Sequence, residues 1–234
     1  GVVLVFAVVA IFALMSSKRA EQNKVWVGLS KETAHQLGTP ISSLMAWTEI
    51  LKETYSDSPL IPEMEKDVKR LQLIAERFSK IGSVPELETH NIVAALDRAV
   101  DYMSRRASNH IEVVKKYTRE NINVRMNSAL FEWVIENLSK NAMDAMAGNG
   151  VLSFEVNDVP GKVLIDVSDT GKGIPHKNFN SVFMPGYTTK KRGWGLGLSL
   201  AKRIIEEYHH GKIYVLSSEI GKGTVFRIEM PKLS

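Results

Sequence analysis

Cysteine is absent from this sequence of 234 residues, so the chain has no disulfide, no thiolate zinc site and no cysteine nucleophile. The chain also lacks a large excess of either charge, because 30 lysines and arginines against 26 acidic residues leave a formal net charge of only +4. No extended basic run stands out, so nucleic acid is not expected as a partner. With 44% hydrophobic residues, the chain has the length and composition for one large or two modest domains with real cores.

One uncharged apolar segment, residues 1–15, opens the chain. As a helix it would extend about 22 Å, less than the roughly 30 Å hydrocarbon core of a bilayer. Lys18, Arg19 and Lys24 follow it, which is the basic flank typical of the cytoplasmic side. Because the chain begins at Gly1 rather than at methionine, we expect residues 1–16 to be the end of a longer transmembrane helix. A signal peptide is less favoured because a charged n-region is missing, and a buried core helix is the other alternative.

Residues 17–84 have the pattern of two long helices. Small and apolar residues at alternating spacings of three and four form the seam of a helix that packs on helices: Val27, Ser30, Ala34, Leu37, Ile41, Leu44, Thr48, Leu51 and Tyr55. His35 lies one position past this seam, at the flank of a bundle. A turn is expected at residues 55–59, followed by a second helix whose apolar stripe is Met64, Val68, Leu71, Ala75 and Phe78. Two such helices cannot enclose a core alone, so we predict a homodimeric four-helix bundle.

Beyond Pro85 the pattern changes to mixed elements. Helices are predicted over 90–107, 128–147 and 198–209, and strands near 110–117, 122–126, 151–158, 162–168, 212–217 and 223–230. Helices and strands that do not strictly alternate predict an α+β sandwich with helices on one face of a mixed sheet. At the predicted helix end, His209 and His210 are expected to act as caps, where positive charge suits the helix dipole.

Two motifs of this second part combine polar side chains with glycine. Asn137 and Asn141 are four positions apart and share one helical face, so both amides can point at a metal-bound phosphate. A carboxamide oxygen is a suitable ligand for Mg²⁺. Asp169 directly follows an apolar strand and can accept an adenine amino proton, while Gly171 and Gly173 allow the backbone to approach the base.

Two further motifs are glycine-rich turns. Residues 193–198 read Gly-Trp-Gly-Leu-Gly-Leu and open a predicted helix, where backbone amides and the helix dipole form an anion site. This turn is neither a Walker loop nor a dinucleotide fingerprint, because no Gly-Lys-Ser/Thr ends it and no strand immediately precedes it. Residues 221–224, Gly-Lys-Gly-Thr, precede the last predicted strand. Each motif alone is weak, but their order and spacing make a specific pattern.

With these motifs in this order, the chain resembles a sensor histidine kinase. The stretch around His35 resembles the H box of that family, residues 137–145 the N box, 169–175 the G1 box, 179–183 the F box and 193–198 the G2 box. The resemblance implies an all-α dimeric phosphotransfer domain at 17–84 and a Bergerat (GHKL) ATP-binding domain at 85–234. It also implies a response regulator receiver domain as partner, and a place in the inner membrane of a bacterium with the catalytic part in the cytoplasm.

The resemblance also assigns roles to single residues. His35 would accept the phosphoryl group, Thr39 would orient water for its removal from the regulator, and Asn141 would ligate Mg²⁺. The implied ATP contacts are Asn137, Asn141, Asp169, Gly171, Gly173, Lys190, Gly195, Leu196, Gly197 and Thr224. Lys190 belongs to a Thr-Thr-Lys form of the mobile ATP lid.

One departure from the family concerns the base beside His35. Many members have Glu or Asp directly after the phosphoacceptor, whereas this chain has Gln36, which cannot be a base. Our hypothesis is that Glu32, one helical turn earlier, takes over part of that task, and the alternative is that Glu32 is a solvated charge.

Two alternative functions share the ATP fold. The first is a pseudokinase that acts as a membrane-tethered dimeric scaffold, and Gln36 is the residue that supports this alternative. A GHKL-type ATPase would need a catalytic Glu at position 137, where this chain has Asn. Glu136 is one residue away, about 100° around the helix, so net ATP hydrolysis is disfavoured.

Overall fold

The computed structural model describes residues 37–81, 85–190 and 195–233. The chain divides into two compact units, Gly1–Pro85 and Glu86–Ser234. The predicted transmembrane segment at 1–16 lies outside the described residues, as do Glu32, His35 and Gln36. The described helices include none that is both long enough and apolar enough to cross a membrane.

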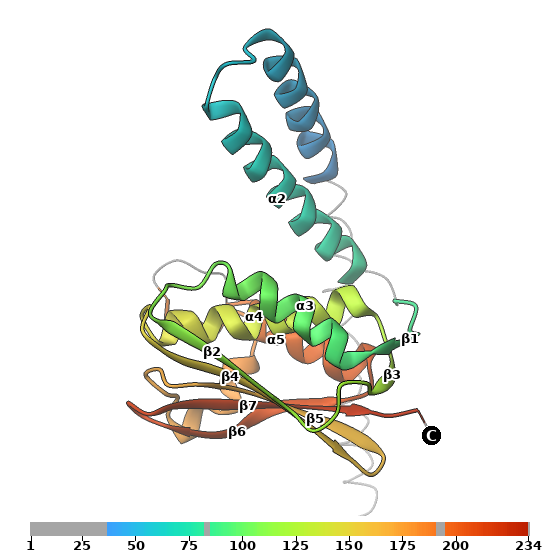
Figure 1. Cartoon of the computed structure of the whole chain (residues 1–234), viewed down its shortest axis with the longest axis vertical. Helices are drawn as coiled ribbons and strands as arrows, with labels where there is room; N and C mark the ends of the chain where they lie inside the picture. The colour runs from blue at the N-terminus through green and yellow to red at the C-terminus, as the bar shows by residue number, and fades with distance from the viewer. Residues whose placement is uncertain (1–36, 82–84, 191–194, 234) are drawn as a thin grey trace, which may run out of the picture. The chain divides into compact units, whose positions relative to one another are not determined.

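The described part of the first unit is a pair of helices (Figure 1). One helix covers residues 37–54 and the other, α2, spans Leu60–Ile81. The predicted turn between them is confirmed, and within it the amide of Ser58 donates to the carbonyl of Tyr55 at 3.1 Å. The buried residues of this pair repeat at helical spacing: Ile41, Thr48, Ile61, Val68 and Ala75.

The second unit is built on a mixed sheet, as predicted, and this sheet has five strands. Its strand order is β2 (Ile111–Tyr117), β4 (Gly150–Val159), β5 (Lys162–Asp169), β7 (Gly223–Pro231) and β6 (Lys212–Glu219). Only β2 and β4 run parallel, and the other neighbours are antiparallel. The helices α3 (Ile92–Ser104), α4 (Ser128–Ala145) and α5 (Gly197–Arg203) lie on one side of this sheet (Figure 1). Two 3₁₀ turns, His176–Asn178 and Ser181–Phe183, lie between β5 and α5.

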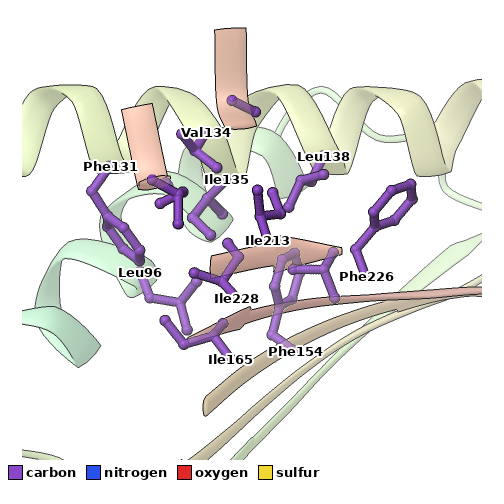
Figure 2. Close-up of a cluster of buried hydrophobic side chains, with 14 of the residues drawn as sticks. Leu96, Phe131, Val134, Ile135, Leu138, Phe154, Ile165, Ile213, Phe226 and Ile228 are labelled. Atoms are coloured by element: carbon purple, nitrogen blue, oxygen red, sulfur yellow. The ribbon is translucent and has the colours of Figure 1, made fainter. Parts of the chain in front are cut away.

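Strand alternation explains where the core lies. Along β5, Val163, Ile165 and Val167 are buried and face the helices. They meet a cluster from α4 that includes Phe131, Ile135 and Leu138, together with Phe154, Phe226 and Ile228 from neighbouring strands (Figure 2). On the opposite face of β5, Asp166 accepts two hydrogen bonds from the guanidinium of Arg227, at 2.7 and 2.6 Å. The buried apolar side chains of β5 therefore lie on the face that the helices cover, and the opposite face carries a charged pair.

A two-stranded ribbon corrects the predicted start of one helix. We expected a helix over 90–107, but His90 lies in β1 (Glu88–Asn91), which pairs antiparallel with β3 (Asn123–Met126). The helix begins at Ile92 because Asn91 is its N-cap and accepts the amide of Val93 at 3.0 Å. Asn127 caps α4 in the same way, by accepting the amide of Leu130 at 3.1 Å.

The expectation of positive charge at His209 is wrong. After α5 the helix widens into a π turn, Ile204–Tyr208, and His209 is 1% exposed. Its Nε2 accepts the backbone amide of Asn127 at 2.9 Å, and its Nδ1 lies 2.7 Å from the carbonyl of Ile204. An accepting Nε2 places the single ring proton on Nδ1, so the histidine is neutral. It does cap the helix end, and it also links that end to the N-cap of α4.

This burial predicts a pH-dependent stability. Burial lowers the pKa of His209 below its ordinary value of 6.5, so the unfolded chain takes up the proton first as pH falls. The free energy of unfolding should therefore decrease by about 1 kcal/mol between pH 7.5 and 5.5 through this residue alone. Urea denaturation at both pH values should show a smaller decrease for His209→Gln than for wild type. An exposed histidine from another segment provides the control, because His110→Asn should keep the wild-type dependence.

Candidate ATP-binding site

The two asparagines of α4 lie one turn apart, and each has a distinct neighbour. Asn141 Oδ1 accepts a hydrogen bond from Lys190 Nζ at 2.8 Å. Asn137 lies against the first turn of α5, where a Cβ atom on Gly197 would come within 2.4 Å of Asn137 Oδ1. The Nδ2 of Asn137 is buried and has no hydrogen-bond partner among the described residues. Gly197 thus allows an amide donor of α4 to reach the start of α5, where an anion would meet free backbone amides.

Asp169 ends the central strand β5 and is 8% exposed. Its Oδ1 accepts the backbone amide of Gly171 at 2.8 Å. Burial raises the pKa of the Asp169 carboxyl above its ordinary value, while backbone hydrogen bonds from Gly171 and Thr224 act in the opposite direction. These contacts fix the carboxylate of Asp169 as a hydrogen-bond acceptor at a buried strand end.

Gly171 and Gly173 are required by close packing. A Cβ atom on Gly171 would lie 2.6 Å from the carbonyl carbon of Ala145, the last residue of α4. The amide of Lys172 donates to the carbonyl of Ala145 at 3.1 Å. At Gly173, where φ is +75°, a Cβ atom would lie 2.2 Å from the carbonyl oxygen of Glu219 in β6. The glycine loop therefore touches the end of the asparagine helix on one side and the last hairpin on the other.

The last glycine turn holds this loop in place. A Cβ atom on Gly223 would lie 1.8 Å from the carbonyl oxygen of Asp169, and φ of Gly223 is +125°. The amide of Gly221 donates to the carbonyl of Lys172 at 2.9 Å. Thr224 is buried and pairs with Asp169 across the β5–β7 ladder.

Ser218 is a site residue that the sequence motifs did not reveal. Its Oγ accepts the amide of Ile174 at 2.8 Å and donates to the carbonyl of Gly223 at 2.8 Å. The hydroxyl oxygen of Thr224 lies 2.9 Å from Ser218 Oγ. One serine on β6 thereby joins both glycine turns. It lies outside every motif, so no sequence signal distinguished it from its neighbour Ser217.

The described ends of the predicted lid are joined by a pair of glycines. The amide of Gly186 donates to the carbonyl of Gly195 at 3.0 Å, and a Cβ atom on Gly195 would lie 2.4 Å from the carbonyl carbon of Gly186. Both have positive φ, +83° and +63°. Leu196 follows as the half-buried N-cap of α5 and accepts the amide of Leu200 at 3.0 Å. Gly193 and Trp194 of the predicted motif lie outside the described residues.

The structure thus brings eight of the ten predicted ATP contacts together in two groups, and the other two, Gly195 and Leu196, directly precede Gly197 in the chain. Asn137, Asn141, Lys190 and Gly197 form one group, and Asp169, Gly171, Gly173 and Thr224 form the other. Ala145 joins them, because Gly171 packs on the end of the helix that carries both asparagines. Thr39 is exposed on the helix of the first unit.

A magnesium ion would need few protein ligands here. Among the described residues, no three His, Cys, Asp or Glu side chains cluster as a metal cage would require. The oxygen of Asn141 already accepts a hydrogen bond from a cationic group, which fits a place for positive charge. Mg²⁺ commonly binds through one or two side chains, several waters and substrate phosphates, and Asn141 fits that mode of binding.

Comparison with known proteins places this part of the chain in a family. Residues 126–234 match the family described as histidine kinase-, DNA gyrase B- and HSP90-like ATPase. Sporulation kinase D of Bacillus subtilis (strain 168) is 28% identical over 224 residues, which cover 92% of this chain and 44% of that protein. Sensor histidine kinase ZraS of Salmonella typhimurium is 29% identical over 230 residues, which cover 94% of this chain and 49% of that protein. The chain spans about half the length of the curated relatives it matches.

Solved structures of one histidine kinase, ThkA, are also similar. Its catalytic domain is 30% identical with a TM-score of 0.58, covering 63% of this chain and 97% of that domain. ThkA in complex with response regulator protein TrrA is 26% identical with a TM-score of 0.61, covering 93% of this chain and 65% of that one. Fold and site together define a Bergerat-type (GHKL) ATP-binding domain. The chain belongs to the protein-histidine kinases.

The glycine packing predicts a contrast between two neighbouring substitutions. Gly221→Ala places a methyl group in open space at positive φ, which should cost about 1 kcal/mol of stability and leave nucleotide binding intact. Gly223→Ala also meets the carbonyl of Asp169, so it should displace the buried carboxylate and weaken nucleotide binding at least about tenfold. Calorimetric titration with a non-hydrolysable ATP analogue checks both. Equal affinities of the two variants would contradict a packing role for Gly223.

Proposed function

We propose that the chain is the catalytic part of a sensor histidine kinase that transfers the γ-phosphoryl group of ATP to His35 and then to an aspartate of a response regulator. The observation that carries this proposal is the joining of the two site groups at Ala145. Asn141 supplies an oxygen for the metal and phosphate end of ATP, and Asp169 supplies an acceptor for the adenine amino group. The domains would be the end of a transmembrane helix at 1–16, the phosphotransfer helices at 17–84 and ATP binding at 85–234.

The proposed first step joins the γ-phosphorus to a nitrogen of His35. The lone pair of that nitrogen forms the N–P bond while the bond to the bridging oxygen breaks, and ADP leaves with that electron pair. The proton on the other ring nitrogen passes to a base. Mg²⁺, when bound, would neutralise charge on the phosphates. The chain's own contribution is positioning: Asn137 and the start of α5 meet the phosphates, and Lys190 adds positive charge.

The proposed homodimer is supported by the helix pair of the first unit. Among the described residues of the two predicted apolar stripes, some are buried within the pair and others are exposed: Ile41, Thr48, Val68 and Ala75 are buried, and Leu37, Leu44, Tyr55, Met64 and Leu71 are exposed. The exposed large side chains include Leu44 at 43%, Met64 at 44%, Leu71 at 44%, Ile50 at 56% and Trp47 at 65%. A second copy of the pair would cover these side chains and complete a four-helix bundle.

The proposed partner follows from the phosphorylated histidine. ThkA, which is similar to this chain, is known in complex with a response regulator. A receiver domain would take the phosphoryl group from His35 onto a carboxylate. Thr39 lies one turn after His35 in sequence and is exposed, so it is free to orient a water for the reverse loss of phosphate from the regulator. The proposed location is the inner membrane of a bacterium, with the catalytic part in the cytoplasm.

Labelling with γ-³²P-ATP tests the kinase proposal. Wild type should acquire label that is stable in alkali and labile in acid. His35→Ala should abolish the label, whereas the exposed control His110→Ala should retain it. Asn141→Ala should reduce labelling at least about a hundredfold, because it removes the proposed metal ligand. Label that persists in His35→Ala would contradict the assignment of the acceptor. An unlabelled wild type that still binds nucleotide would favour the pseudokinase scaffold.

The role of Glu32 has its own test. If Glu32 orients or deprotonates the imidazole, Glu32→Gln should slow autophosphorylation by about a hundredfold, the lower end of the range for general base catalysis. Gln36→Glu, which restores the carboxylate at the usual family position, should recover the rate in the Glu32→Gln background. A rate within about twofold of wild type for Glu32→Gln alone would leave Glu32 as a solvated charge.

A further inference from the structure

The ammonium group of Lys190 lies between two oxygens of α4. Lys190 Nζ is 2.8 Å from Asn141 Oδ1 and 2.5 Å from Asp144 Oδ2. Asn141 and Asp144 are three positions apart, so both face the same side of the helix. Both charged side chains remain about half exposed, at 40% for Lys190 and 45% for Asp144.

A second contact attaches the same segment to another part of the site. Thr189 Oγ1 accepts a hydrogen bond from Lys172 Nζ at 3.3 Å, and the amide of Lys190 donates to Thr188 Oγ1 at 3.1 Å. Lys172 belongs to the glycine loop that follows Asp169. The described end of the lid is therefore tied both to the asparagine helix and to the loop on the adenine side.

We propose that Asp144 is a positioning residue that holds the lid lysine on Asn141, so that Lys190 is an internal cation which magnesium-bound ATP must displace. This inference rests on the proposed function, in which Asn141 Oδ1 is the magnesium ligand. Two cations at one amide oxygen repel each other at short range, so the metal and the ammonium exclude one another there. Once displaced, Lys190 is free to pair with the phosphates, and the lid changes partner rather than losing one.

Asp144 has a specific part in this exchange. Its carboxylate supplies the negative charge that keeps Lys190 on α4, whereas the amide of Asn141 is neutral. The tethered lid lowers the fraction of molecules that are competent to bind nucleotide. Because the apparent affinity decreases in proportion to that fraction, the tether weakens nucleotide binding. Removing the carboxylate should increase that competent fraction.

Nucleotide binding provides the first test, with the non-hydrolysable analogue AMP-PNP and Mg²⁺ as the probe. In the full 234-residue chain, Asp144→Asn should tighten binding about two- to fivefold, the range expected from one exposed ion pair. The same substitution should change nothing in a Lys190→Gln background, since no lysine remains to be held. A gain in both backgrounds would mean that Asp144 acts only by repelling phosphate, and no gain in either would also overturn the proposal.

Hydrogen exchange provides the second test, in the protein without nucleotide. Asp144→Asn should accelerate exchange of the backbone amides in residues 185–190 at least about threefold, because a released segment opens more often. Asp101→Asn is the matched control, because Asp101 is an exposed aspartate paired with Lys115 at 2.8 Å instead of with the lid. Unchanged exchange in Asp144→Asn would overturn the tether. This result does not depend on kinase activity, so it stands even if His35 is never labelled.

Discussion

Gly171 lies against the carbonyl end of Ala145, and both halves of the proposed ATP site depend on that contact. The helix that ends at Ala145 carries the two asparagines, and the strand that precedes Gly171 ends in the buried aspartate. A side chain at position 171 would require the helix and the sheet to move apart, because packed interiors absorb little extra volume. The glycine therefore sets the spacing between the phosphate end and the adenine end of the site. Its role is close packing, more than chain flexibility.

The buried carboxylate of Asp169 is held by the sheet itself. Its strand pairs with β4 on one side, where it faces Leu152, and with β7 on the other, where it faces Thr224. Two backbone amides donate to it, which offsets part of the cost of burying its charge. The ladder hydrogen bonds fix the backbone of Asp169 on both sides, and the amides of Gly171 and Thr224 hold its carboxylate in place. This arrangement favours a ligand donor, such as an exocyclic amino group, that completes its hydrogen bonding.

Periodicity and motif order were enough to predict most of the second unit. The helix over 128–147, the strand before Asp169 and the last hairpin follow from the alternation and spacing of apolar residues, and the structure confirms them. The errors occur where contacts between distant segments determine the local structure or the protonation of a side chain. β1 forms because β3 lies beside it, and the neutral state of His209 depends on an amide 82 positions away in sequence. Ser218 and the contact of Lys190 with Asn141 depend in the same way on side chains from distant segments. The roles of Glu32, His35 and Gln36 stay predictions.

The chemical character of α4 bears on which acceptor the site favours. The residue at position 137 is an amide whose nitrogen is a buried donor without a partner among the described residues. An amide can donate to a phosphate oxygen but cannot remove a proton from water, which a hydrolase needs at this place. Glu136 points about 100° away around the helix, so it cannot substitute at the same face. Asp144 carries the carboxylate on the face of Asn137 and Asn141, but it lies two helical turns from position 137, where a hydrolase needs its base. The helix thus offers donors and a cation to the phosphates but no base to water. That combination suits transfer to a nucleophile that attacks without first losing a proton, such as an imidazole nitrogen, better than hydrolysis.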